Sequence, residues 1–169
     1  MTTHHHCEIN SPIGTLRLVA TDDALTGLYM ERHNGKDGYP ALAEGSKRDP
    51  GWPVLKKAAD ELTRYFTGEL MRFTVKHAGQ GTAFEQTVWR ALCDIKLGKT
   101  ESYGGLAKRI GKPGAARAVG LANGRNPISI IVPCHRVIGA DGSLTGYGGG
   151  IPRKTWLLTH EAKMAAKAG

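Results

Sequence analysis

The sequence lacks several features that define whole classes of protein. Among its 169 residues only three are cysteines, Cys7, Cys93 and Cys134, and none belongs to a C-x-x-C pair, so they form no disulfide framework. The longest apolar run, residues 128–133, is interrupted by Ser129 and is far too short to span a bilayer. The first ten residues hold no basic region followed by an apolar core, so we do not interpret them as a secretory signal. We therefore expect a cytoplasmic protein with reduced thiols.

Acidic residues are scarce in the second half of the chain. Residues 1–81 contain 10 Lys or Arg and 10 Asp or Glu, whereas residues 82–169 contain 13 and 5, so the net charge of +8 lies entirely in the second half. Such an excess is compatible with general solubility. It also suits a polyanionic partner, and nucleic acid is the commonest polyanion.

The pattern of residues 1–78 predicts a small α/β domain, a sheet with one helix. Three strand-like runs are separated by turn signals, at residues 7–9, 14–20 and 25–31. Residues 33–53 are expected to form an exposed loop, and apolar residues at helical spacing predict a helix over 55–66. Residues 77–81 have the composition of a linker and place a domain boundary near residue 79.

Residues 79–169 predict a mainly α-helical domain. Four helical segments are expected, at residues 82–98, 103–110, 115–123 and 152–168. Thr82 and Glu85 form a capping box at the start of the first. A tight Gly/Pro turn joins the second and third, which makes them a candidate helix-turn-helix. The third contains mostly small residues besides Arg117, which permits close approach either to a neighbouring helix or to a DNA groove.

The apolar run at 128–133 leads into the sequence Pro133-Cys134-His135-Arg136, and we interpret the run as a buried strand. A cysteine after such a run is often an inert core residue. Pro133 favours a turn that presents the thiol, and His135 can act as a base. Because adjacent residues of a strand point in opposite directions, His135 reaches Cys134 only across a turn or through a water molecule. The residues alone leave both a nucleophilic and a structural Cys134 open.

The two other cysteines have simpler interpretations. Cys93 lies in an apolar helical pattern and is expected to pack in the core. Cys7 follows His4-His5-His6, which is a conceivable metal cluster, but the segment has no distant ligands and we expect no metal there.

The sequence resembles the O6-alkylguanine-DNA alkyltransferases, also called methylated-DNA–protein-cysteine methyltransferases. Pro133 to Val137 matches the active-site motif of this family, and the resemblance covers residues 80–161 in order and spacing. Further matching segments are Phe84–Trp89, Ser102-Tyr103, Ala115–Gly120, Asn126-Pro127, Gly146-Tyr147 and Trp156–Glu161. The first half matches loosely, as a short α/β domain that opens with residues 11–14.

The resemblance implies direct repair of DNA alkylated at guanine O6, and less well at thymine O4, by irreversible transfer of the alkyl group to Cys134. In this family the helix-turn-helix binds the minor groove of double-stranded DNA and the damaged nucleotide rotates out of the stack, because O6 is beyond the reach of a protein nucleophile inside the duplex. The thioether product has no easy leaving group, so each molecule reacts once. We expect a monomer without cofactor, metal, membrane association or obligate protein partner, and we leave cooperative assembly on DNA open.

The roles of the family's residues carry over to individual positions. Cys134 would attack the alkyl carbon, His135 would take the thiol proton through a water molecule, and Glu161 would hold the imidazole. Asn126 would brace the turn that carries Cys134. Tyr103 would crowd the phosphate 3′ to the lesion and protonate the leaving guanine.

The resemblance also assigns DNA and pocket contacts. Arg117 would enter the base stack and fill the space left by the flipped nucleotide. The other DNA-contacting positions have small side chains that permit close approach to the groove, namely Ala115, Ala116, Ala118 and Gly120. The pocket would be shaped by Pro133, Val137, Tyr147, Gly148 and Gly149. Relatives often carry serine or alanine where Gly148 stands, so we expect weaker binding of bulky guanine analogues. The first half has only Cys7 as a thiol, so we expect none of the structural zinc that some relatives bind.

Two other functions stay open. A lesion-binding module would mark alkylated DNA without repairing it, and the intact Cys134 counts against this alternative. A cysteine hydrolase or acyltransferase that uses Cys134 and His135 would leave the charge excess and Arg117 unexplained. Arg136 is expected to be structural and to tie neighbouring elements together.

Overall fold

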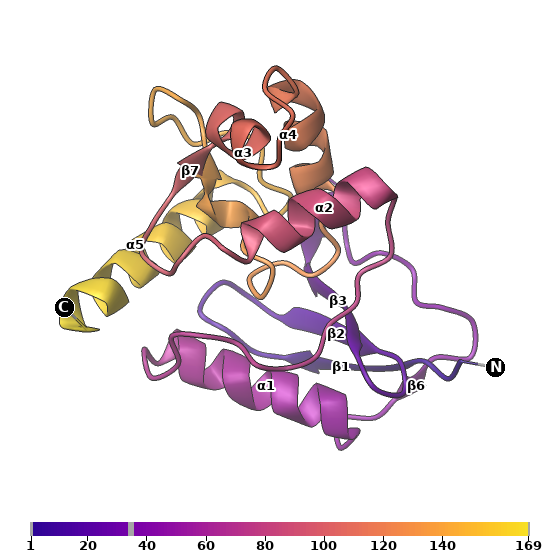
Figure 1. The fold of residues 1–169 in the computed structure, drawn as a ribbon. Coiled ribbons are helices and arrows are strands. Elements are labelled where there is room, and N and C mark those ends of the chain that lie inside the picture. The colour runs from indigo at the N-terminus through magenta and orange to yellow at the C-terminus, as the bar shows by residue number, and fades with distance from the viewer. Residues whose placement is uncertain (1, 34–35, 169) are drawn as a thin grey trace.

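A computed structural model describes residues 2–33 and 36–168, which form two adjoining units (Figure 1). The first unit contains a four-stranded sheet in the order β3-β2-β1-β6. Its strands are β1 (His5–Ile9), β2 (Leu16–Ala20), β3 (Leu25–Met30) and β6 (Lys47–Arg48). The first three pair in antiparallel fashion, and β6 pairs parallel to β1. Buried and partly exposed residues alternate along β2, as expected for a sheet with one face on the core.

A single long helix, α1 (Pro53–Phe66), packs against this sheet (Figure 1). Proline at its start is compatible with the unbonded first turn of a helix. The segment expected to be an exposed loop, residues 33–53, also contains short strands. These are β5 (Lys36–Asp37), which pairs with β4 (Arg32–His33), and β6. The exposure of β5 and β6 agrees with the expectation, although their pairing was not predicted.

The second unit is mainly helical. Its elements are α2 (Ala83–Leu92), β7 (Glu101–Ser102), α3 (Tyr103–Arg109), α4 (Ala116–Gly124), the 3-10 helix η1 (Cys134–Arg136), β8 (Val137–Ile138) and α5 (Ile151–Ala168). The capping box predicted for α2 is present, with Thr82 Oγ1 accepting from the amide of Glu85 and the Glu85 carboxylate accepting from the amide of Thr82. The helix ends at Leu92, earlier than expected. The predicted fold class, a small sheet with a helix followed by a mainly helical unit, is confirmed.

The two units share one hydrophobic core. They are also joined by backbone hydrogen bonds at the β3 edge of the sheet. The amide of Leu28 donates to the carbonyl of Pro127 (2.9 Å), and the amide of Ser129 donates to the carbonyl of Leu28 (3.3 Å). The segment before Cys134 is therefore attached directly to the N-terminal sheet. No helix within residues 2–33 and 36–168 is long and apolar enough to cross a membrane.

Candidate functional site

Cys134 follows a tight turn where we predicted a buried strand at residues 128–133. The prediction of a strand is wrong, because only Ile128 forms an isolated bridge, to Leu28, and turns occupy the following residues. The prediction of burial is confirmed for this segment. Ile130 has a φ of 73°, in the left-handed region that is strained for a β-branched side chain. Such strain persists only where the surroundings hold it, and it is frequent at functional sites.

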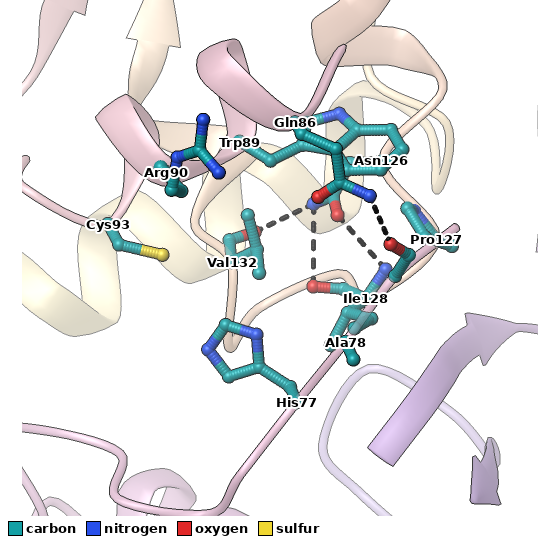
Figure 2. A pocket seen from close by; sticks show the side chains of 11 residues that line it. His77, Ala78, Gln86, Trp89, Arg90, Cys93, Asn126, Pro127, Ile128 and Val132 are labelled. Atoms are coloured by element: carbon teal, nitrogen blue, oxygen red, sulfur yellow. Dashed lines mark hydrogen bonds between the residues drawn. The ribbon is translucent and has the colours of Figure 1, made fainter. Parts of the chain in front are cut away.

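Asn126 holds this turn from inside. Its side-chain amide donates to the carbonyl of Val132 (2.8 Å) and, at 3.4 Å, to that of Ile128, while its Oδ1 accepts from the amide of Ile128 (3.0 Å). Figure 2 shows these bonds beside a pocket of about 300 Å³. The arrangement agrees with the bracing role expected for Asn126. Because Asn126 is buried, its three bonds do not compete with bulk water.

Cys134 and His135 lie in the short helix η1, not on opposite sides of a strand. The thiol is buried, and burial raises its pKa, while the nearby side-chain amide of Asn126 and the charge of Lys154 act in the opposite direction. The rest state is therefore a protonated thiol. Such a thiol reacts as a nucleophile only where a neighbouring group accepts its proton.

The neighbouring side chains form a buried network, which we call the acceptor cluster and define as Cys134, His135, Arg136 and Glu161. Glu161 extends from α5, and its Oε2 lies 2.8 Å from His135 Nε2. Arg136 donates to both oxygens, from Nε to Oε1 (2.8 Å) and from Nη2 to Oε2 (3.0 Å), and Nη1 donates to the carbonyl of Ile95 (2.5 Å). The structural role predicted for Arg136 is thereby confirmed, because it ties η1 to α5 and to the segment after α2.

These contacts determine which nitrogen of His135 is able to accept a proton. Burial acts to raise the pKa of Glu161, but the charge and hydrogen bond of His135, together with Arg136, hold that pKa well below its usual range. An ionised carboxylate only accepts hydrogen bonds, so His135 Nε2 carries the hydrogen and Nδ1 is the acceptor in the neutral ring. Within the described residues Nδ1 is buried and has no hydrogen-bond partner. A water molecule between Nδ1 and the thiol remains our prediction.

Two buried residues near this cluster were not found from the sequence. Lys154 of α5 is fully buried, and its Nζ donates to the carbonyls of Val137 (2.6 Å) and Thr145 (2.9 Å). Tyr65 of α1 is also fully buried, and its hydroxyl donates to Glu161 Oε2 (2.7 Å). The helical pattern around Tyr65 marks it as a core residue, but no sequence signal indicates a partner 96 residues away.

The loop before α5 closes around the expected pocket. The Tyr147 ring is buried and meets the His135 ring edge-on, with centroids 6.5 Å apart. A side chain in place of Gly149 would collide with Met30 of β3, so the N-terminal unit also packs on this loop. The Tyr103 hydroxyl donates to the carbonyl of Thr145 (3.3 Å). Other expected pocket residues are buried (Pro133, Val137) or half-buried (Gly148).

The helix α4 has a buried side and an exposed side. Arg117, Ala118 and Leu121 are exposed, and we call these three residues the α4 face. Ala115, Ala116 and Gly120 are half-buried, and Gly120 packs against the Tyr103 ring. On the buried side, the Asn123 amide donates to the backbone carbonyl of Cys134 (3.2 Å). Leu121, with 60% of its surface exposed, was not singled out from the sequence.

The remaining cysteines differ from each other. Cys93 was expected to pack in the core, but this prediction is wrong because it follows the last residue of α2 and is exposed. Cys7 is buried in the sheet, where burial raises its pKa to about 11. Of the adjacent histidines, His5 stacks on Trp52 and His6 Nδ1 lies 2.8 Å from Ser46 Oγ.

Comparison with known protein families divides the chain into the same two units as the fold does. Residues 6–77 match the family described as 6-O-methylguanine DNA methyltransferase, ribonuclease-like domain, and residues 83–163 match 6-O-methylguanine DNA methyltransferase, DNA binding domain. The chain belongs to the 6-O-methylguanine DNA methyltransferase family. The methylated-DNA–protein-cysteine methyltransferase of Mycobacterium tuberculosis (strain H37Rv) is 52% identical over 161 residues, which cover 95% of this chain and 94% of the relative. That of Methanosarcina barkeri is 46% identical over 153 residues, covering 90% and 94%.

Solved structures of this family agree in fold. The crystal structure of M. tuberculosis OGT in complex with DNA superimposes with a TM-score of 0.86 at 51% identity, covering 95% of this chain and 94% of that one. The crystal structure of the M. tuberculosis O6-methylguanine methyltransferase gives 0.87, also at 51% identity, with 96% and 94% covered. The family interpretation drawn from the sequence is therefore confirmed, and the protein is an alkyltransferase of this family.

Proposed function

We propose that Cys134 is the alkyl acceptor of this methyltransferase and takes the alkyl group from O6-alkylguanine, and less well from O4-alkylthymine, in double-stranded DNA. Proteins of this family repair methylated DNA by transfer to a protein cysteine. Of the three cysteines, Cys134 is the one beside the buried His135–Glu161 pair. This pair, with Nδ1 as its open proton acceptor, is the observation that carries the proposal.

The transfer is an in-line substitution at the alkyl carbon. The thiol proton passes through a water molecule to His135 Nδ1, and the resulting imidazolium is stabilised by the Glu161 carboxylate. A bond forms between Sγ and the alkyl carbon while the bond from that carbon to O6 breaks, and its electron pair leaves with the guanine. Tyr103 supplies a proton to the leaving base. The product is a thioether, so each molecule acts once.

The α4 face and the residues beside it are the proposed DNA-binding surface. Arg117 is exposed at the start of a helix that consists mostly of alanine and glycine, which permits a close approach to the minor groove. We propose that Arg117 replaces the flipped base in the stack, and that Ala115, Ala116, Ala118 and Gly120 lie along the groove. The hydrogen bond from Asn123 to the backbone carbonyl of Cys134 links this helix directly to the residue that carries the acceptor thiol.

The proposal includes the setting in which the protein acts. We propose two domains, residues 1–78 and 79–169, and the family matches that end at 77 and begin at 83 support this division. We also propose a cytoplasmic monomer without cofactor, metal or obligate protein partner. The free thiols of Cys7, Cys93 and Cys134 support a reducing compartment.

Peptide mass analysis after incubation with O6-methylguanine duplex tests the acceptor assignment. We expect one methyl group per molecule, on the peptide that contains Cys134, with loss of transfer in Cys134→Ser and normal transfer in Cys93→Ser. Tight binding to the lesion without its removal would favour the lesion-binding module. Repeated turnover of an ester or amide would favour the hydrolase.

A further inference from the structure

The Glu161 carboxylate accepts hydrogen bonds from three residues, one of which comes from the N-terminal unit. His135 and Arg136 belong to η1, whereas Tyr65 belongs to α1. Tyr65 donates to Oε2, the same oxygen that faces His135 Nε2. These two donors, at 2.7 and 2.8 Å, therefore share one acceptor atom, which also accepts from Arg136 Nη2 (3.0 Å).

Tyr65 is held firmly in this position. Its ring is fully buried and lies against Phe66, Phe73 and His160, with centroids 5.2 to 5.3 Å apart. Its backbone carbonyl lies 2.7 Å from His160 Nε2, so both the backbone and the hydroxyl of Tyr65 contact successive residues of α5. Burial and the nearby Glu161 charge raise the pKa of Tyr65 well above its usual value. The hydroxyl is therefore a permanent donor at neutral pH.

The hydroxyl affects the His135–Glu161 pair in two ways. It fixes the position of Oε2, and hence the orientation of the imidazole whose Nδ1 is proposed to take the thiol proton. It also satisfies part of the negative charge on Oε2, which weakens the hold of that oxygen on the imidazole hydrogen. Without this hydroxyl Oε2 would hold the imidazole hydrogen more tightly, so the pair would stay protonated to higher pH and less of it would be free to accept the thiol proton.

We propose, on the basis of the function proposed above, that Tyr65 is a positioning residue for alkyl transfer, through which the N-terminal unit sets the geometry and proton affinity of the His135–Glu161 pair. The N-terminal unit thus has a part in the chemistry beyond its contacts with the Cys134 turn. Tyr65 touches neither the alkyl group nor the base in this account, and acts only through Glu161.

The variant Tyr65→Phe tests this role, because it keeps the ring and removes only the hydroxyl. We expect the single-turnover rate constant at neutral pH to fall about tenfold with O6-methylguanine duplex and equally with free O6-benzylguanine, since the change affects the transfer step and not nucleotide flipping. On the acid side of the pH profile, the pH at which the rate constant falls to half of its plateau value should rise by about half a unit. The final amount of alkylated protein gives the active fraction, so partial unfolding does not distort the rate constant.

Tyr39→Phe is the matched control. It removes another tyrosine hydroxyl bond of the N-terminal unit, from Tyr39 to the carbonyl of Thr15 (2.8 Å), and should leave the rate and its pH profile unchanged. A Tyr65→Phe variant that is less stable but has the wild-type rate constant and pH profile would show a merely structural role and overturn the inference. Slowing confined to the duplex substrate would also overturn it. Absence of transfer to Cys134 in the wild type would instead refute the proposed function.

Discussion

The acceptor cluster and the α4 face differ in almost every physical property, although the hydrogen bond from Asn123 to the Cys134 carbonyl joins them. The acceptor cluster is buried, contains ionised groups and holds its carboxylate by hydrogen bonds from both units. The α4 face is exposed and has one long charged side chain among small or apolar ones. Chemistry at a thiol with a raised pKa requires a fixed proton acceptor, whereas groove binding requires access. A substitution in one region should therefore have a kinetic signature that a substitution in the other lacks.

The largest expected effect among the substitutions is that of Glu161→Gln. Loss of the carboxylate leaves the buried Arg136 guanidinium without its charged partner and removes the group that stabilises the His135 imidazolium. We expect transfer to slow by about 10²-fold or more with both duplex and free base, and the free energy of unfolding to fall by about 3 kcal/mol. Single-turnover kinetics and denaturant unfolding measure the two effects.

Glu61→Gln provides the matched control for that substitution. Glu61 is also a buried glutamate, and it accepts hydrogen bonds from Thr74 and Val75 far from the acceptor cluster in sequence. We expect this variant to lose stability while the rate constant of its folded fraction stays at the wild-type value. Equal slowing in both variants would remove the distinction between the acceptor cluster and an ordinary buried carboxylate.

Arg117→Ala should affect the opposite step. The exposed guanidinium is proposed to replace the flipped base, so repair of duplex DNA should slow by about 30-fold while reaction with free O6-benzylguanine changes less than about twofold. Comparison of the two substrates in the same buffer measures this ratio. Equal losses on both substrates would refute a role in nucleotide flipping.

Acid should reduce the contribution of the acceptor cluster to the stability of the fold, because Glu161 becomes protonated. Because the pKa of Glu161 is lower in the folded protein than its ordinary value of 4.5, its contribution to stability is fully present above that value and is lost as pH falls toward the folded pKa. Across that window one such group changes the free energy of unfolding by up to about 1.4 kcal/mol per pH unit. The stability difference between the wild type and Glu161→Gln, followed by unfolding from pH 6 to pH 3 (roughly the window in which a glutamate titrates), should shrink as pH falls. A constant difference would contradict the assignment.

The features predicted from sequence were those with local signals. The capping box at Thr82 needs only neighbouring residues, and it is present. The apolar run before Cys134 correctly indicated burial but wrongly indicated a strand, because a buried turn and a buried strand have the same hydrophobic pattern. The left-handed conformation of Ile130 has no signal in sequence, since isoleucine is a residue that rarely adopts it.

Contacts between segments that are distant in the chain could not be predicted from the sequence. Lys154 on a helix is ordinarily read as a solvated charge, yet two carbonyls of other segments bind it in the interior. Tyr65 has the spacing of a core residue, and only the packing of α1 on α5 brings its hydroxyl to Glu161. The motif around Cys134 identified the chemistry, but the tertiary structure was needed to find the groups that set the proton affinity of its base.

The central claim is that one buried thiol, Cys134, accepts the alkyl group and does so once. Peptide mass analysis of the wild type, Cys134→Ser and Cys93→Ser, after each has reacted to completion with excess O6-methylguanine duplex, tests it most directly. We predict one methyl group on the Cys134 peptide in the wild type and in Cys93→Ser, and none in Cys134→Ser. Methyl transfer that persists in Cys134→Ser, or a methyl group found on Cys7 or Cys93, would contradict the account.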